Sequence, residues 1–321
     1  MLKNKVLIVG ISGQDGLLLA QYLLKETNYE IVGTFYSSSS KTLEAKISKN
    51  VNFNRNRIKF LKFDILNDSI SKLIKDTEAD QVYLLAWDSS VGRSFINPYK
   101  SYDLASALID GLKETKEVTT GKTKVLFASS GDLIYTKNKS DNYIHWHSPY
   151  AAAKSFVVFS LLSLRSCGAV IKIAHLFPHE SQYRSDSFLL PSLLKQIRNL
   201  NKSNNVVNVG NTEIVRDWGW AEEYVCGMAL LMLNDKVNDA VFCTGHGMSV
   251  SEVINFMLDY HKIGKRNVLI KTQNSKLRSN ELLSSIGMTN LTRQELGWKA
   301  KLIGKDVVYK LCDMMKQDNN S

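Results

Sequence analysis

The sequence predicts an α/β fold: a doubly wound parallel sheet with a smaller α/β lobe at its C-terminal side. Short apolar runs alternate with helical segments from the N-terminus to Leu176, and a glycine-rich turn follows the first run. After Leu176, shorter elements and polar loops take over. Alternating strand and helix signals are typical of a parallel sheet with helices on both faces. A chain of 321 residues also exceeds one compact domain, so a second lobe is expected.

The strands are predicted from short apolar runs bounded by polar residues or glycine. The first helix is expected over residues 17–24. A later helix is expected to begin near Pro149, because Ser148 and Pro149 precede an alanine run. The predicted strands cover residues 5–10, 30–35, 58–63, 81–86, 124–128 and 170–175.

A glycine loop joins the first predicted strand to the first helix. Gly10 permits the tight turn, Gly13 lets a pyrophosphate approach the backbone, and Gly16 lets the helix pack on the strand. The helix N-terminus adds free N–H groups and a partial positive charge. This context predicts a Rossmann-type dinucleotide-binding domain, although such glycines can also serve a turn alone. We expect this domain to span 1–176 with a return at about 211–246, and the smaller lobe to span 177–210 and 247–321.

The end of the second predicted strand bears on the choice of dinucleotide. NAD sites often carry Asp or Glu there, and residues 34–41 contain neither. Ser37, Ser38 and Lys41 offer hydroxyl and ammonium donors for a 2′-phosphate, which favours NADP over NAD. The serine run is also compatible with a solvated loop. Asp64, at the end of the third strand, is the expected acceptor for the adenine amino group.

Tyr150 and Lys154 form a Y-x-x-x-K pair on one face of the helix predicted near Pro149. A phenol titrates near ~10, and a neighbouring ammonium lowers that pKa, so the pair predicts an acid–base group. Tyr135 and Lys139 have the same spacing, but loop-forming residues follow Tyr135. We therefore assign the acid–base role to Tyr150.

Ser130 and Asp132 follow the fifth predicted strand, at the sheet edge where parallel sheets bind ligands. The Ser130 hydroxyl can hydrogen-bond a sugar oxygen beside the tyrosine, and the Asp132 carboxylate can move a proton. An ordinary turn is the alternative interpretation of this segment.

The net charge of +10 does not indicate a nucleic-acid binder, because Lys and Arg are spread along the chain among Asp and Glu. A basic chain also suits polyphosphate ligands. No apolar run approaches the length of a membrane span, and the N-terminus resembles a strand more than a signal peptide. The four cysteines contain no C-x-x-C, and the histidine pairs lack carboxylate or thiolate neighbours at ligand spacing. We predict a cytoplasmic protein without a metal site.

The motifs resemble those of the extended short-chain dehydrogenase/reductase family, and specifically its GDP-mannose 4,6-dehydratase branch. The resemblance covers almost the whole chain. It implies a Rossmann domain with a sugar-nucleotide lobe, a tightly bound NADP, a GDP-sugar substrate, and a homodimer or homotetramer. Its clearest segments are GISGQDG, LLAWDSSVGRSF, LFASSGDL, SPYAAAK, LFPHES, VGNTEIVRDWGWAEEYV and LRSNELL.

The resemblance also implies a reaction in three steps. Tyr150, supported by Lys154, removes the sugar O4 proton while the C4 hydride passes to the nicotinamide. Asp132 takes the C5 proton as water leaves from C6, and the hydride returns to C6. Ser130 stands where the branch has Thr. The product is a 4-keto-6-deoxy sugar.

The remaining site residues implied by the resemblance fall into two sets. The predicted cofactor-binding residues are Gly10, Gly13, Gln14, Asp15, Gly16, Tyr36, Ser37, Asp64, Ile65, Leu85 and Ala86, together with Tyr150 and Lys154. The predicted substrate-binding residues are Ser89, Ser90, His179, Glu180, Arg184, Arg216, Arg278 and Glu281, with the three arginines on the diphosphate.

Several positions depart from the branch, and they leave alternatives open. Asp132 is one methylene shorter than the branch's Glu. The rival hypothesis is a GDP-sugar C4 dehydrogenase, reductase or epimerase without the dehydration step, and a non-catalytic dinucleotide-binding protein is a third. The sequence does not distinguish mannose from a heptose or another hexose. The other departures are Gly131 for a hydroxyl residue, Pro178 for Asn, Trp87 and Asp88 for Ala and Gln, and Tyr36 and Ser37 for two arginines.

Overall fold

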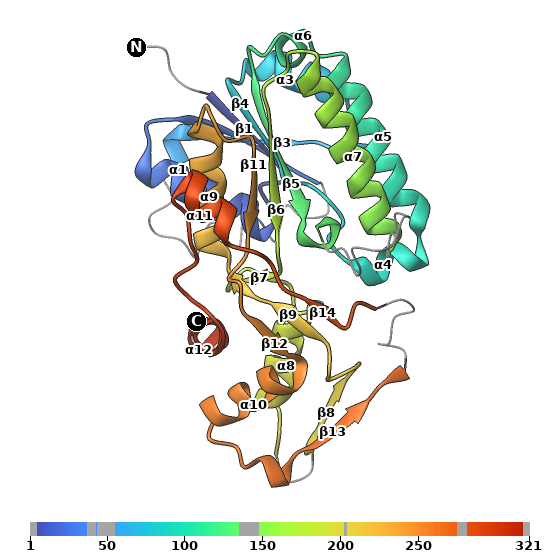
Figure 1. Ribbon diagram of the computed structural model, residues 1–321, viewed down its shortest axis with the longest axis vertical. Helices are drawn as coiled ribbons and strands as arrows, with labels where there is room; N and C mark the ends of the chain where they lie inside the picture. Colours follow the sequence, from blue (N-terminus) through green and yellow to red (C-terminus); the bar gives the residue numbers. More distant parts are fainter. Residues whose placement is uncertain are drawn as a thin grey trace.

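The computed structural model describes residues 5–36, 43, 55–134, 148–201, 204–274 and 281–316. A seven-stranded parallel sheet forms the upper part of the molecule in Figure 1, and a smaller lobe lies below it. The strand order is β11-β6-β5-β4-β1-β2-β3. These strands are β1 (Lys5–Val9), β2 (Glu30–Phe35), β3 (Ile58–Lys62), β4 (Gln81–Leu84), β5 (Lys124–Ser130), β6 (Ile171–Leu176) and β11 (Asp239–Phe242).

Both faces of the sheet are buried under helices, which confirms the predicted fold class. Side chains alternate along a strand, so Val6 and Ile8 pack into the core beneath one helical layer, while Leu7 and Val9 pack beneath the other. The first layer contains α1 (Gln14–Glu26), α9 (Ala221–Leu233) and α11 (Asn290–Leu296). The second contains α3 (Ile70–Thr77), α5 (Pro98–Lys113), α6 (Lys116–Thr119) and α7 (Pro149–Ser166), with α4 (Val91–Ile96) near its lower end.

The observed elements differ from the predicted ones mainly at their ends. Helix α7 begins as expected: Pro149 occupies its first turn, and the Ser148 hydroxyl caps it by accepting from Ala151 N at 3.1 Å. Strand β5 continues to Ser130, two residues beyond its predicted end. Helix α1 begins at Gln14 inside the glycine loop, since a loop rich in glycine hides where the helix starts. Within the described ranges, none of the helices combines the length and apolar character needed to cross a membrane.

The lobe has its own hydrophobic core, built around Trp218, Trp220 and Met257. Helix α10 (Val250–Tyr260) is fixed at its start by a capping box between Ser249 and Glu252. The other lobe elements are β7 (His179–Glu180), α8 (Leu189–Arg198), β8 (Val206–Val209), β9 (Val215–Asp217), β10 (Gly219–Trp220), β12 (Gly247–Ser249), β13 (Leu269–Thr272), β14 (Ser284–Ser285), α12 (Lys305–Lys316) and the 3-10 turn η4 (Lys265–Asn267). Two further 3-10 turns belong to the large sheet: η2 (Arg55–Arg57) leads into β3, and η3 (Gly131–Leu133) follows β5.

The chain crosses between the two parts at places that differ from the predicted boundaries. Strand β9 pairs with β12 and β14 in the lobe. Within residues 211–246, β11 is the strand that pairs in the large sheet, and α9 is the helix that packs on that sheet. Helix α11 and Trp298 also lie against the large sheet, although the sequence placed them in the lobe. The Trp298 ring packs on Tyr224 and Phe242. Trp298 belongs to no periodic pattern of apolar residues, so the sequence does not indicate which surface it packs against.

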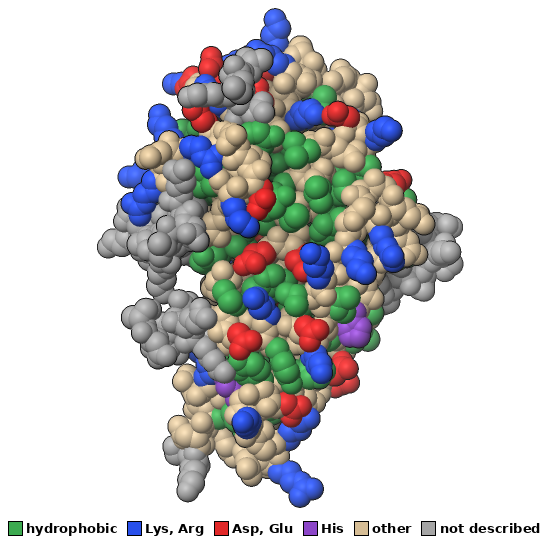
Figure 2. Space-filling view, turned by 90° about the vertical axis from the view of Figure 1, so that its left-hand side faces the viewer, with side chains coloured by type: hydrophobic (Ala, Val, Ile, Leu, Met, Phe, Trp, Pro, Cys, Tyr) green, Lys and Arg blue, Asp and Glu red, His purple; other side chains and the backbone are tan. Residues whose placement is uncertain are grey.

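The distribution of charged side chains on one face of the molecule bears on whether the net positive charge indicates nucleic-acid binding. On the side shown in Figure 2, Lys and Arg side chains are scattered among Asp and Glu, with hydrophobic side chains gathered between them. A nucleic-acid site usually concentrates its basic side chains in one stripe. This face has no such stripe among its described residues, so the positive charge does not favour nucleic acid there.

Candidate active site

The structure brings the four predicted catalytic side chains together at the carboxyl edge of the sheet. Ser130 is the last residue of β5, Asp132 follows in η3, and Tyr150 and Lys154 lie on the first turns of α7. The Ser130 side chain hydrogen-bonds Tyr150, and Asp132 acts on the phenol through its charge. Three of the four are nearly buried, with exposed fractions of 9% for Ser130, 8% for Tyr150 and 4% for Lys154. The arrangement can therefore hold and move a proton away from bulk water.

The pKa of Tyr150 is raised, which corrects the expectation from sequence that Lys154 lowers it. Burial is the largest cause, and the negative charge of Asp132 adds to it. The Ser130 hydrogen bond and the charge of Arg184 act in the opposite direction. Among the described residues, Ser130 and Arg184 thus favour the phenolate more than Lys154 does.

Lys154 is turned toward other groups. Its Nζ donates to the Ala128 carbonyl at 2.5 Å and lies 6.0 Å from the centroid of the Tyr150 ring. The rings of Trp87 and Phe127 are each centred 4.4 Å from Nζ. Burial lowers the pKa of Lys154 to about 7, against the opposing charge of Asp15. Phe127 was not among the predicted site residues. Its place on the face of β5 that α7 covers is a period-two position, and that pattern could have identified it.

The glycine loop has the shape that a dinucleotide pyrophosphate requires. Gly10 has φ +99°, and a Cβ there would lie 2.7 Å from Ala86 N. A Cβ on Gly16 would collide with the Gly10 carbonyl, so helix and strand approach closely. Gly13 begins α1 without a side-chain cap, and a Cβ there would approach only Gly10 O, at 3.4 Å. The first turn of α1, whose N–H groups have no partner within the helix, and the open space at Gly13 therefore fit a phosphate.

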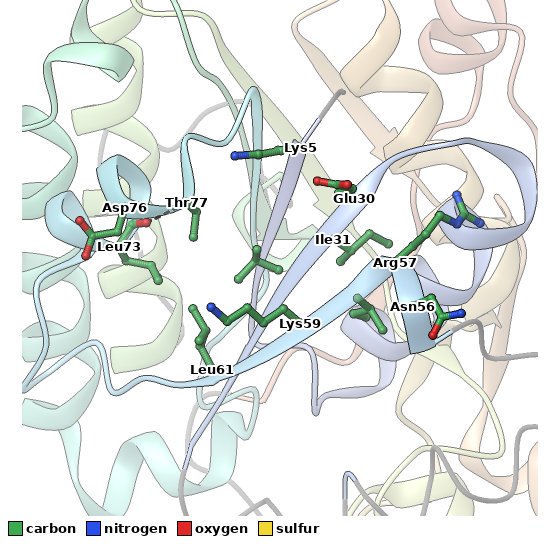
Figure 3. Close-up of a pocket in the computed structure, with 12 residues that line it drawn as sticks. Lys5, Glu30, Ile31, Asn56, Arg57, Lys59, Leu61, Leu73, Asp76 and Thr77 are labelled. Atoms are coloured by element: carbon green, nitrogen blue, oxygen red, sulfur yellow. Dashed lines mark hydrogen bonds between the residues drawn. The ribbon is translucent and has the colours of Figure 1, made fainter. Parts of the chain in front are cut away.

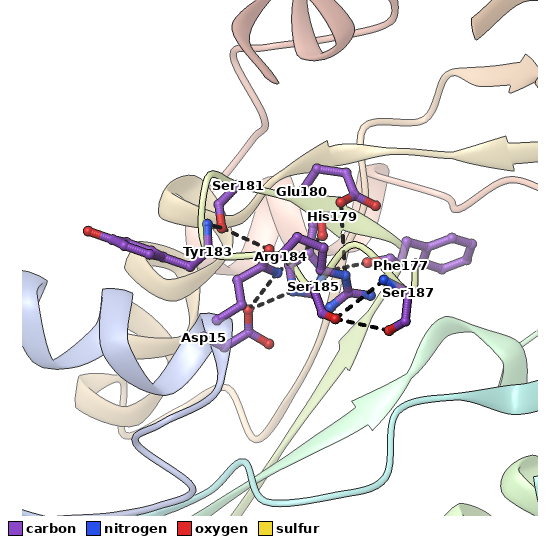
Figure 4. A network of polar contacts seen from close by, with 10 residues as sticks. Asp15, Phe177, His179, Glu180, Ser181, Tyr183, Arg184, Ser185 and Ser187 are labelled. Atoms are coloured by element: carbon purple, nitrogen blue, oxygen red, sulfur yellow. Dashed lines mark hydrogen bonds and ion pairs between the residues drawn. The ribbon is translucent and has the colours of Figure 1, made fainter. Parts of the chain in front are cut away.

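A polar clasp ties this loop to the lobe (Figure 4). We define the clasp as Gln14, Asp15, His179 and Ser181. Gln14 donates to His179 O at 3.2 Å and accepts from the Ser181 hydroxyl at 2.8 Å. The His179 ring contacts two acceptors, Phe177 O at 2.7 Å through Nδ1 and Asp15 Oδ1 at 2.9 Å through Nε2. Both ring nitrogens must then donate, so His179 is an imidazolium.

The pKa values in the clasp agree with this protonation state. Burial opposes charge on both partners, but the charge and hydrogen bond of Asp15 raise the pKa of His179 overall. The same contacts bring the pKa of Asp15 down to about 2. Asp15 was predicted to bind the cofactor and His179 the substrate. In the structure, both side chains contact each other across the junction of loop and lobe.

Arg184 and Glu180 lie beside the clasp with polar atoms left without hydrogen bonds. Arg184 Nε is 3.9 Å from Glu180 Oε2, and neither atom has a hydrogen-bond partner among the described residues. The guanidinium stacks 3.7 Å from the centroid of the Phe188 ring. Its charge acts on both Asp15 and Tyr150, so Arg184 lies within electrostatic range of the glycine loop and of the tyrosine. Burial raises the pKa of Glu180 against the effect of Arg184.

Arg216 and Glu281, predicted for the diphosphate and the nucleoside, pair with each other. Arg216 Nη2 lies 2.6 Å from Glu281 Oε1, and Nη1 donates to the Leu282 carbonyl at 2.8 Å. Asp217, which belongs to the motif VGNTEIVRDWGWAEEYV but was not among the predicted site residues, fixes this region. Its buried carboxylate accepts from Thr244 N at 2.9 Å, Thr244 Oγ1 at 2.7 Å, Gly245 N at 2.8 Å and Gly287 N at 3.3 Å. Arg278 and Ser37 lie outside the described residues.

Some predicted contact residues already have roles within the protein. The Ser90 hydroxyl caps α4 by accepting from Arg93 N at 3.2 Å, and Asp88 pairs with Arg93 at 2.6 Å. The Asp64 carboxylate accepts from Leu66 N at 3.1 Å within its own turn. The other predicted contacts lie at the same sheet edge: Tyr36 and Ile65 just after β2 and β3, and Leu85, Ala86 and Ser89 after β4.

Packing explains why position 131 is glycine, which the sequence did not indicate. A Cβ at this position would lie 2.6 Å from the Phe177 ring. The ring therefore fills the space in which a side chain at residue 131 would lie. The departure at 131 thus reflects packing beside the site.

A pocket of about 550 Å³ lies away from these residues (Figure 3). It is lined by the amino ends of β1 to β3 and by the end of α3, with Lys5, Glu30, Lys59 and Asp76 among its side chains. Arg57 at its rim donates to Thr27 O at 2.6 Å and thus helps to end α1. Ligands of doubly wound sheets bind at the carboxyl edge, so this pocket is separate from the candidate site.

The chain is similar to known proteins over nearly its whole length. A family model described as GDP-mannose 4,6 dehydratase matches residues 7–311. The GDP-mannose 4,6-dehydratase of Vibrio cholerae serotype O1 is 26% identical over 354 residues, covering 97% of this chain and 93% of that protein. The human GDP-mannose 4,6 dehydratase is 30% identical over 279 residues, covering 78% and 71%.

Solved structures show the same fold. The dTDP-glucose 4,6-dehydratase of Bacillus anthracis, in complex with NAD, has a TM-score of 0.79 at 13% identity, covering 99% of this chain and 98% of that one. The UDP-glucose 4-epimerase of Thermotoga maritima, with UDP-glucose, has a TM-score of 0.79 at 18% identity, covering 98% and 99%. At these identities the likeness bears on the fold alone.

Proposed function

Because the chain belongs to the GDP-mannose 4,6-dehydratase family, we propose that it removes water from GDP-mannose or a related GDP-sugar and gives a 4-keto-6-deoxy sugar. The observation that carries this proposal is the meeting of Ser130, Asp132 and Tyr150 beside the glycine loop. Hydroxyl, carboxylate and phenol are the groups that the two proton transfers need. The human and Vibrio cholerae relatives carry the same activity in their names.

When bound, a nicotinamide dinucleotide would supply the acceptor for the C4 hydride and the hydride that reaches C6. Tyr150 Oη takes the proton from the sugar O4, and the Ser130 hydrogen bond and the Arg184 charge stabilise the phenolate. The Asp132 carboxylate takes the proton from C5 and passes it to the C6 hydroxyl, which leaves as water. When hydride reaches C6, the proton held by Tyr150 Oη would return to C5. Burial of Tyr150 and Lys154 keeps bulk water away from these transfers.

We assign NADP as the preferred dinucleotide and NAD as the alternative. Gly10, Gly13 and Gly16 with the start of α1 hold the pyrophosphate. Residues 34–41 contain no acid that would repel a 2′-phosphate. Titration of the purified protein with NADP and with NAD tests the choice. A tighter dissociation constant for NAD would reverse it.

Exposed aromatic side chains support a homodimer. Tyr99 and Tyr102 on α5 are 75% and 41% exposed, and Phe156 and Phe159 on α7 are 47% and 58% exposed. The two helices are neighbours on one face of the sheet (Figure 1). A second copy of the chain would bury these rings. Light scattering during gel filtration tests this, and a monomeric mass at micromolar concentration contradicts it.

The cysteines of the described chain are free, which supports the cytoplasm as the compartment.

The mass of the product tests the proposed reaction. Purified protein is incubated with NADP and either GDP-mannose or a GDP-heptose. A product lighter by one water, without accumulation of reduced dinucleotide, supports the dehydratase. Asp132 is shorter than glutamate, and this observation favours the second candidate, a C4 oxidoreductase. A product that keeps all its oxygen atoms, formed with stoichiometric reduced dinucleotide, replaces the dehydratase with that candidate, and an isomer of the substrate points to an epimerase.

A further inference from the structure

Trp87 and Phe127 form an aromatic corner around the ammonium of Lys154. Their ring centroids are 6.2 Å apart at an interplanar angle of 75°, and each centroid lies 4.4 Å from Lys154 Nζ. We infer that this aromatic corner holds the Lys154 ammonium in place and favours its charged form against the effect of burial, and that Trp87 is a positioning residue that acts through Lys154. The role of Lys154 in turnover rests on the proposed function, whereas its place in the corner does not.

The corner compensates for an unusual environment. Lys154 is only 4% exposed, and within the described part of the chain the nearest contacts of its Nζ are the Ala128 carbonyl and the two ring faces. A buried ammonium needs compensation from carbonyl oxygens, carboxylates or aromatic faces. Here two of the three contacts are aromatic. Removing one ring face therefore removes a large share of what stabilises the charged form.

The Trp87 indole is held by its face and not by its N–H group. Its Nε1 is buried and has no hydrogen-bond partner among the described residues. A buried indole usually finds a partner for its N–H, so packing on the cation and on Phe127 is what fixes this ring. The family branch resembled by the chain has Ala at this position, and Ala has no ring face to offer. The corner is thus a feature of this chain's own residues.

Three titratable groups lie on the segments that contribute to the surroundings of Lys154. Asp15, at the start of α1, acts through its charge and favours the ammonium. Tyr150 lies one turn away on α7, with its ring centroid 6.0 Å from Nζ. Asp88, next to Trp87, is paired with Arg93. Burial lowers the pKa of Lys154 to about 7, so the ammonium and the amine have similar populations near neutral pH. A modest change in ring contacts therefore changes the charged fraction strongly.

The direct test is the titration of Lys154 in the full chain without cofactor. Lysine labelled with carbon-13 at Cε reports the ionisation by NMR, and a Lys154→Arg sample identifies the signal. Trp87→Leu keeps an apolar side chain but removes the ring face, and we expect the titration midpoint to fall by about one pH unit. Trp87→Phe keeps a ring face, and we expect its midpoint to stay near that of the wild type. Phe127→Leu supplies a second variant, with a fall in the same direction.

The outcomes separate this inference from the proposed function. Midpoints that stay unchanged or rise in both leucine variants overturn the aromatic corner. A fall in a leucine variant that Trp87→Phe does not show supports it. The alkaline limb of the kcat/KM profile against pH is then measured with GDP-mannose. It should move to lower pH with Trp87→Leu, because the charge of Lys154 would add to that of Arg184 in stabilising the phenolate. A lower midpoint with an unmoved limb leaves the corner intact and removes Lys154 from the proposed reaction.

Discussion

Polar groups around Tyr150 and Lys154, at the carboxyl edge of the sheet, have shifted pKa values or lack hydrogen bonds, whereas those around Arg216 in the lobe are paired. At the edge, Tyr150 has a raised pKa, Lys154 a lowered one, and Arg184 Nε lacks a hydrogen bond. In the lobe, Arg216 is paired with Glu281, and the carboxylate of Asp217 accepts four hydrogen bonds.

The contrast indicates where a ligand gains most from binding. Buried groups without partners cost free energy, so a ligand that supplies partners at the edge recovers that cost. At the Arg216 end, a diphosphate must instead compete with Glu281. We therefore expect substitutions at the edge to act on turnover, and substitutions at Arg216 to act on affinity.

The largest effect is expected for Tyr150→Phe. Only the phenolic oxygen is lost, so packing of the 8%-exposed ring should survive. Loss of the group that moves the O4 proton should lower kcat by about 10²–10⁴-fold, with little change in the affinities for NADP and GDP. Single-turnover kinetics and calorimetry measure both. Turnover like that of the wild type would assign the proton transfer to another group.

Asp132→Asn should affect a later step of the same edge. The amide cannot take the C5 proton, so water loss should slow by about 10²–10⁴-fold while C4 oxidation continues. Reduced dinucleotide should then accumulate on the protein, visible by its absorbance. Asp132→Glu is the matched control, since it restores an acid with a longer arm. If Asp132→Asn still releases the 6-deoxy product at the normal rate, the C5 base lies elsewhere.

The contrast between the two regions also separates what the sequence predicted from what it did not. Local patterns identified the glycine loop, the start of α7 at Ser148, and the tyrosine–lysine pair, because each depends on neighbours in the chain. The contacts of Lys154 with Trp87 and Phe127 join three segments far apart in sequence. The pKa of Tyr150 depends on burial, which spacing cannot report. The docking of Trp298 on Tyr224 was hidden for the same reason.

A smaller effect is expected for Arg216→Ala. The variant loses a charged hydrogen bond to the diphosphate, which typically costs about 1.5–3 kcal/mol, or roughly tenfold or more in affinity for GDP. The affinity for NADP should hardly change. Arg216→Lys keeps the charge but cannot bind in a bidentate way, so its affinity for GDP should be intermediate. Calorimetry with GDP measures all three proteins. Equal GDP affinities would place the diphosphate away from Arg216.

The smallest effect concerns the clasp between the two regions, and it depends on pH. The pKa of Asp15 is about 2 in the fold against a usual 3.8, so its contribution to stability is present above about pH 4 and is lost as pH falls through 2. The charged form of His179 has the opposite effect on the pH dependence of stability, and it acts at higher pH. Its pKa is raised from 6.5, so its contribution is present below that value and is lost as pH rises through the raised value.

Asp15→Asn should therefore lower the free energy of unfolding at pH 6 by about 2 kcal/mol, and by much less near pH 2.5. Urea unfolding at the two pH values measures the difference. Asp235→Asn is the control, because Asp235 pairs with Lys124 with 84% of its side chain exposed, and such surface pairs stabilise little. An equal loss for Asp15→Asn at both pH values would mean that packing, and not the ion pair with His179, joins the glycine loop to the lobe.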